Sequence, residues 1–195
     1  MNRRNFVHTL ALSTMAASLA LAGCTTTGTS GESAATDASK RQAIDASVDG
    51  ALSKLNSTVQ GSHELLAKAQ GVLVFPDVKK AAFIVGGSYG EGALRVGGAS
   101  VGYFSTASAS FGLQAGAQST AVFFLFMTQN ALDKFRNSSG WTAGADAAVS
   151  LLKVGANGQI DTSSASAEVV AIVLTNAGLM ADISVAGTKV TKMNI

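Results

Sequence analysis

The sequence predicts an α+β fold, in which N-terminal helices precede a curved, glycine-rich antiparallel β-sheet with one short inserted helix. Two observations lead to this prediction. Apolar residues recur at helical spacing between residues 44 and 59, whereas short apolar runs broken by glycine follow residue 71. These runs recur at intervals of roughly ten residues, which suits hairpins and meanders better than strand–helix–strand units. We therefore expect antiparallel pairing.

The first 23 residues have the order of a bacterial export signal, with Arg3 and Arg4 before an apolar stretch and small residues. A membrane-spanning helix needs about 20 apolar residues. This apolar stretch is shorter and is interrupted by polar residues. Its end, LAGC at residues 21–24, resembles the lipobox of bacterial lipoproteins, which are cleaved before the cysteine and acylated on it. Cys24 is the only cysteine of the chain. We expect a lipoprotein signal peptide over residues 1–23 and lipid attachment, including palmitate, at Cys24.

Lipid attachment would keep the protein on a membrane, because two or three acyl chains anchor a protein durably. Thr25 rather than an aspartate follows the cysteine, and by resemblance to such signals this favours the outer membrane, with the domain facing the periplasm. Arg3 and Arg4 before Asn5 and Phe6 also resemble a twin-arginine signal, so both export routes stay open.

The charge balance argues against nucleic-acid binding. The chain has 14 basic and 12 acidic residues, and loss of Arg3 and Arg4 with the signal leaves 12 of each. A neutral chain lacks the basic excess that neutralises a phosphate backbone. Residues 24–38 are rich in Thr, Ser and Gly, which is typical of a flexible linker. The remaining residues 39–195 are enough for one domain.

Two helices are expected at the start of this domain. Between residues 39 and 59 an apolar stripe recurs in steps of three and four residues. Its members are Ile44, Val48, Leu52, Leu55 and Val59. Ser62 is suited to cap a short helix that runs to Ala69 and ends at Gly71.

The predicted strands follow. The run GVLVF, residues 71–75, precedes Pro76 and Asp77, which we interpret as a stop and turn. The run AVFFLFM, residues 121–127, is too short to span a bilayer and predicts a strand buried on both faces. A helix is expected to begin near Asn130 and to end at Gly140, and further strands occupy the last third.

The glycine-rich stretch between residues 85 and 102 invites comparison with phosphate-binding loops. It lacks the sixth-position glycine of a dinucleotide fingerprint and the Gly-Lys-Ser/Thr of a P-loop, and no helical pattern follows it. Glycine inside strands marks bulges, bends or close approaches of backbone. We therefore expect strands and turns here.

Groups suited to catalysis are few, and we predict neither enzymatic activity nor a cofactor. His63 is the only histidine outside the signal and is expected to be exposed. It has no company that would form a metal site or a nucleophilic dyad. The scattered carboxylates show no spacing that singles out a catalytic pair.

Three ordered segments resemble the SYLF domain family, over most of residues 65–190. They are GVLVFPDVKKAAFIVGGSYGEGAL, SASFGLQAGAQSTAVFFLFMT and GLMADISVAGTKV. The resemblance implies a module that binds phospholipids or phosphoinositides, with actin binding in some eukaryotic members. For an anchored bacterial protein it favours general phospholipid binding.

A lipid headgroup would be met by cations, because anionic headgroups attract each Lys or Arg near a surface by about 1 kcal/mol. The candidates are Lys79, Lys80, Arg95, Lys134 and Arg136. The leading hypothesis is a lipid-anchored envelope protein that binds phospholipids. A module that binds a protein partner is the alternative, and a lipid-processing enzyme is a distant third.

Overall fold

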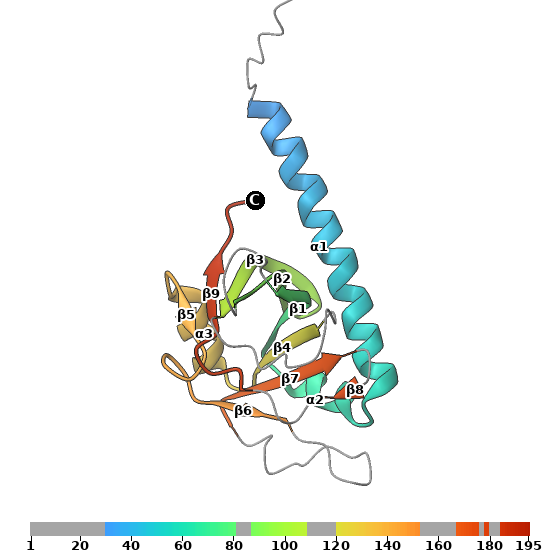
Figure 1. Cartoon of the computed structure of the whole chain (residues 1–195), viewed down its shortest axis with the longest axis vertical. Coiled ribbons are helices and arrows are strands. Elements are labelled where there is room, and N and C mark those ends of the chain that lie inside the picture. Colours follow the sequence, from blue (N-terminus) through green and yellow to red (C-terminus); the bar gives the residue numbers. More distant parts are fainter. Residues whose placement is uncertain (1–29, 81–86, 109–119, 153–166, 176–177, 180–183) are drawn as a thin grey trace, which may run out of the picture.

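The computed structural model describes residues 30–80, 87–108, 120–152, 167–175, 178–179 and 184–195. Within these ranges two helices come first, and a third is inserted among the strands of one sheet (Figure 1). The helices are α1 (Ser30–Thr58), α2 (Ser62–Lys68) and α3 (Gln129–Asn137). The strands are β1 (Gly71–Lys80), β2 (Ser88–Val96), β3 (Ala99–Ser108), β4 (Thr120–Phe126), β5 (Trp141–Thr142), β6 (Val149–Leu151), β7 (Val169–Thr175), β8 (Gly178–Leu179) and β9 (Lys189–Lys192). The predicted α+β fold is confirmed.

The strands form one curled sheet, in the order β5-β9-β3-β2-β1-β4-β7-β6, with β8 paired to β7. Figure 1 shows the sheet curving, with α1 along one side of it. Neighbouring strands are antiparallel, as predicted, except that β6 runs parallel to β7. The C-terminal strand β9 lies beside β3, so the sheet brings the end of the chain next to its first hairpin.

Two hydrophobic clusters cover the two faces of the sheet. Alternate residues of a strand point to opposite faces, so Phe124 and Phe126 pack with α3 whereas Phe123 and Leu125 pack with α1. Every residue of β4 and of β7 is buried. The prediction of a doubly buried strand in the AVFFLFM run is confirmed.

Helix α1 covers one face through the predicted stripe, of which Val48 and Leu55 are fully buried. Ala51 is buried too, while Leu52 is only partly buried. The helix begins at Ser30, so the expectation of a linker as far as residue 38 was wrong for residues 30–38. This part has no large apolar side chain but contains alanines, which have the highest helix propensity and continue the helix without packing. Residues 24–29 lie outside the described residues.

The ends of α2 differ from the prediction. Gly61 occupies the N-cap position with a φ of 84°, and the buried Ser62 hydroxyl donates to the Leu55 carbonyl at 3.3 Å instead of capping the helix. The helix ends at Lys68, and Gly71 begins β1. The reason is the sheet, because the Gln70 amide already donates to the Phe126 carbonyl.

Strand β1 passes through Pro76 and Asp77, so the predicted stop is wrong. The pairing registers with β2 and β4 shift there, as a bulge allows, since proline cannot donate to a ladder. Opposite this bulge, a Cβ on Gly92 would lie 1.9 Å from the Val74 carbonyl oxygen. Only glycine fits this close approach.

The turn between β2 and β3 explains two further glycines. Gly97 and Gly98 have φ of 59° and 85°, and Val96 pairs with Ala99 across them. Such a two-residue hairpin requires positive φ at both positions. Over its described residues, 87–102, the stretch forms β2, a turn and the start of β3, and no helix follows the turn, as predicted.

Candidate functional site

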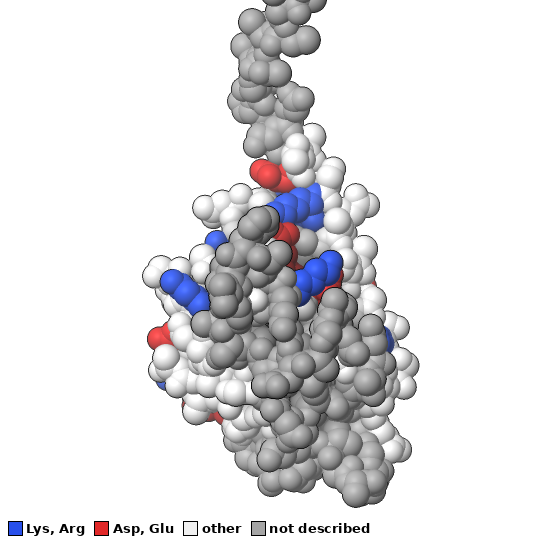
Figure 2. Space-filling model, viewed as in Figure 1, with Lys and Arg blue, Asp and Glu red and all other residues white. Residues whose placement is uncertain are grey.

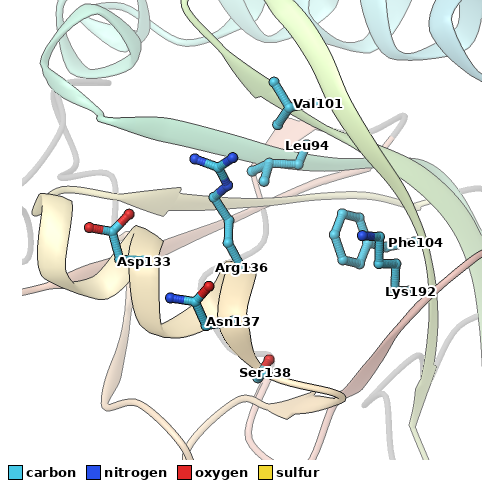
Figure 3. A pocket seen from close by; sticks show the side chains of 8 residues that line it. All are labelled: Leu94, Val101, Phe104, Asp133, Arg136, Asn137, Ser138 and Lys192. Carbon is cyan, nitrogen blue, oxygen red and sulfur yellow. The ribbon is translucent and has the colours of Figure 1, made fainter.

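Helix α3 is held on the sheet by an aromatic cluster. The Thr128 hydroxyl accepts from the Ala131 amide and caps the helix, two residues before the predicted start. Phe135 is buried, and its ring centroid lies 4.8 Å from that of Phe126 and 5.0 Å from that of Phe104. Arg136 follows Phe135 and projects from the helix (Figure 3). The buried phenylalanine thus fixes where this exposed cation stands.

A pocket of about 310 Å³ lies where α3 meets β2, β3 and β9. In Figure 3 Arg136 extends from α3 toward Leu94 and Val101, while Lys192 lies near Phe104 on the other side. The pocket therefore joins parts of the chain that are far apart in sequence. Its lining residues are Leu94, Val101, Phe104, Asp133, Arg136, Asn137, Ser138 and Lys192.

One wall of this pocket is formed by the apolar residues Leu94, Val101 and Phe104, whereas the other five lining residues are polar or charged. Leu94 and Phe104 are buried, whereas Val101 has 46% of its surface exposed. The pairing register between β2 and β3 shifts here, because Leu94 pairs with Gly102 and Arg95 with Ser100. Val101 is the extra residue at this shift, and as a bulge it leaves the regular alternation. The shift accounts for an apolar side chain exposed at the pocket.

The charged groups of the pocket are not paired with each other. Arg136 and Lys192 are exposed and form no ion pair with any described residue. Asp133 accepts a hydrogen bond from the Gln129 side-chain amide at 2.9 Å. The pocket thus offers two cations and one carboxylate beside an apolar wall.

A second charged cluster lies on the opposite face of β2, under α1. The Arg95 guanidinium donates to an Asp49 carboxylate oxygen at 2.6 Å and to the Asp45 carbonyl at 3.3 Å, and 14% of its side chain is exposed. Both Ser100 and Tyr103 donate their hydroxyl hydrogens to the Asp45 carboxylate. Partial burial and this hydrogen bond raise the pKa of Tyr103. These contacts tie α1 to the first hairpin.

The same interface continues around Glu91. Its Oε1 pairs with the Lys40 ammonium at 2.9 Å and accepts from the Tyr89 hydroxyl at 2.8 Å. Partial burial of the tyrosine and this bond raise the pKa of Tyr89 to about 12. Figure 2 shows Lys and Arg atoms beside Asp and Glu atoms in the upper part of this face, near α1. The charges here balance one another within the protein.

The four predicted headgroup ligands whose side chains are described do not converge. Arg136 lines the pocket, while Lys134 is exposed on the same helix but does not line it. Arg95 lies under α1, paired as above. Lys79 pairs with Asp77 at 2.7 Å, which raises the pKa of the lysine. The side chain of Lys80 and the whole of Cys24 lie outside the described residues.

Sequence reasoning missed Lys192 as a site residue. Val190 is buried whereas Thr191 and Lys192 are both exposed, so burial along β9 departs from strict alternation at the pocket. Its position is set by the pairing of Lys192 with Phe104, across 88 residues of chain. No local signal encodes a pairing of that range.

The part of the chain that is described offers little support for a histidine-based site, a metal site or a membrane-spanning helix. His63 is exposed, as predicted. No three His, Cys, Asp or Glu side chains of the described ranges lie close enough to hold a metal ion. Among the described helices, none is long and apolar enough to cross a membrane.

The pocket and the curled sheet point to a binding or regulatory domain, and comparison with known families identifies it. Residues 107–194 match the family Ysc84, described as Las17-binding protein actin regulator. This part of the chain thus matches the SYLF family that the motifs predict. The match covers β4 to β9 and leaves α1, α2, β1 and β2 outside it. No curated protein matches the chain.

Proposed function

We propose that the protein is a lipid-anchored protein of the bacterial cell envelope, whose SYLF domain binds phospholipids without enzymatic activity. The observation that carries the proposal is the pocket in which Arg136 and Lys192, which have no ion-pair partner among the described residues, lie beside the exposed Val101. A phospholipid offers a phosphate to such cations and an apolar part to such a wall. The match of residues 107–194 to the SYLF family supports a binding or regulator role.

The membrane attachment that we propose runs through acylated Cys24, with residues 1–23 removed. The LAGC sequence and the following Thr25 support an outer-membrane lipoprotein that faces the periplasm. Labelling cells with palmitate and separating their membranes tests this. We expect label in the outer-membrane fraction and none on Cys24→Ala. Label that persists on this variant would disprove the attachment site.

Phospholipid binding is tested by flotation of residues 24–195 carrying Cys24→Ser, with vesicles that contain both phosphatidylethanolamine and phosphatidylglycerol. We expect the protein to float, and the double variant Arg136→Gln/Lys192→Gln to lose most of this binding. The matched control is Lys134→Gln/Lys189→Gln, which removes the same charge from α3 and β9 outside the pocket. Equal loss in both variants would show a general charge effect, and no flotation of the parent would refute the function.

Two rival roles have their own tests. The family description names an actin regulator that binds a protein, so a protein-interaction module is the second candidate. A dominant crosslinked partner in cells, retained in the Arg136→Gln/Lys192→Gln variant, would favour it. Turnover of labelled phospholipid by the purified chain would instead indicate an enzyme.

A further inference from the structure

The pocket carries charges of both signs that do not neutralise each other. Asp133 and Arg136 stand one helical turn apart on α3, and both line the pocket with Lys192 of β9 (Figure 3). No ion pair is formed among these three side chains. Beneath α1, by contrast, Arg95 lies 2.6 Å from its carboxylate partner. Unpaired charges of both signs around one pocket match a ligand that itself carries both signs.

We infer that this pocket selects a phosphoethanolamine group, whose phosphate binds Arg136 and Lys192 and whose primary ammonium binds Asp133. The inference rests on the proposed phospholipid binding and names the headgroup. A guanidinium and an ammonium donate charge-assisted hydrogen bonds to phosphate oxygens. One Asp133 oxygen accepts from Gln129, and the other is left to accept from the ammonium of the ligand.

Asp133 makes the pocket selective among headgroups in two ways, because its carboxylate attracts a primary ammonium and repels a phosphate. A primary ammonium donates hydrogen bonds to the carboxylate, whereas the quaternary ammonium of phosphocholine has no hydrogen to donate. A headgroup without a cation, such as phosphoglycerol, brings its phosphate near the Asp133 carboxylate with no ammonium of its own to pair with it. Attraction of the preferred headgroup together with repulsion of the others discriminates more strongly between headgroups than attraction alone.

The exposed Val101 identifies the source of the group as a lipid rather than a free phosphoethanolamine. Its side chain stands at the pocket with 46% exposure, where the glycerol and first methylenes of a phospholipid would follow the headgroup. A soluble phosphoethanolamine has no apolar part and gains nothing from this contact. Val101→Ser therefore separates the two sources.

The experiment measures vesicle binding of residues 24–195 carrying Cys24→Ser. Three vesicle types are used: phosphatidylcholine alone, and equal parts of phosphatidylcholine with phosphatidylethanolamine or with phosphatidylglycerol. We expect about fivefold tighter binding with phosphatidylethanolamine than with phosphatidylcholine alone, the scale of one exposed charge-assisted hydrogen bond. Asp133→Asn should abolish this preference and strengthen binding to phosphatidylglycerol. Glu168→Gln, an exposed carboxylate outside the pocket, should change neither.

The outcomes separate the inference from the function on which it rests. Equal binding of phosphatidylcholine and phosphatidylethanolamine, with loss of both in Arg136→Gln/Lys192→Gln, would overturn the headgroup inference and leave phospholipid binding intact. Failure to bind any vesicle would refute both. A titration with soluble glycerophosphoethanolamine followed by NMR is the second arm. Binding there that exceeds vesicle binding and survives Val101→Ser would refute the lipid source.

Discussion

Arg95 and Arg136 lie on opposite faces of the hairpin formed by β2 and β3, and they differ in whether their charge is paired. On the face under α1, Arg95 is 14% exposed and binds carboxylate and carbonyl oxygens of the helix. On the other face, Arg136 is exposed beside Leu94 and Phe104, and its charge has no partner in the described residues. Neighbouring residues of β2, Leu94 and Arg95, thus belong to different environments.

The difference between the two arginines follows from how far each is buried. A partly buried charge must be paired, because its desolvation is otherwise uncompensated. An exposed charge without a partner costs the fold little and stays free to meet a ligand. The charges under α1 therefore hold the helix, whereas we propose that those around the pocket bind a ligand.

The largest expected effect comes from removing the residue that holds the pocket helix. Phe135→Ala should lower the free energy of unfolding by about 3–5 kcal/mol, because a buried ring in an aromatic cluster leaves a cavity. It should also weaken vesicle binding at temperatures where the variant is folded. Leu55→Ala, which is equally buried but under α1, should cost about 2–5 kcal/mol and spare binding. Denaturant unfolding and flotation measure the two, and a loss of binding in both variants would erase the distinction between the faces.

Exchanging the two arginines for methionine tests the comparison directly. Arg95→Met should lower the free energy of unfolding by about 1–2 kcal/mol, since it leaves the Asp45 and Asp49 carboxylates without their cation. Arg136→Met should change it by less than about 0.5 kcal/mol and should reduce vesicle binding. Urea unfolding curves check both values. Equal destabilisation by the two substitutions would contradict the proposed division.

Raising the salt concentration should affect the interactions on the two faces of the hairpin to different extents. Screening lengths fall from about 10 Å at 0.1 M to about 3 Å at 1 M salt. Vesicle binding through the exposed Arg136 and Lys192 should therefore fall severalfold. The stability difference between the parent and Arg95→Met should change less, because that charge pair is closer and less exposed. Binding that is insensitive to salt would mean that the apolar wall, not the cations, carries the affinity.

The smallest effect concerns the tyrosines of the α1 interface. The pKa of Tyr89 is about 12 in the folded protein and ordinarily about 10. The folded state therefore holds this proton more tightly, so its stabilising contribution is full below about pH 10 and is lost as the pH rises toward about 12. Unfolding curves across this range should show a fall in stability that is smaller in Tyr89→Phe. An identical fall in the variant would assign the effect elsewhere, and ultraviolet titration of the tyrosines provides the check.

The sequence predicted those elements that depend on a local pattern of residues. The period of the apolar residues predicted α1, the short uninterrupted apolar run predicted the doubly buried β4, and the paired glycines at 97–98 fit a hairpin turn. The stop predicted at Pro76 and the cap predicted at Ser62 were wrong, because strand pairing with β2 and β4 and burial against α1 override local preferences there.

What only the tertiary structure decided is which charges meet. The pairing of β9 with β3 brings Lys192 to the pocket beside Arg136, and the packing of α1 brings Asp45 and Asp49 to Arg95. In the sequence, Arg95, Lys134 and Arg136 are equivalent cations. Composition and periodicity determined the two-faced sheet and its helices, since burial of apolar surface depends on the local pattern. The role of each charge depends on contacts across some 50 to 90 residues, which no local pattern records.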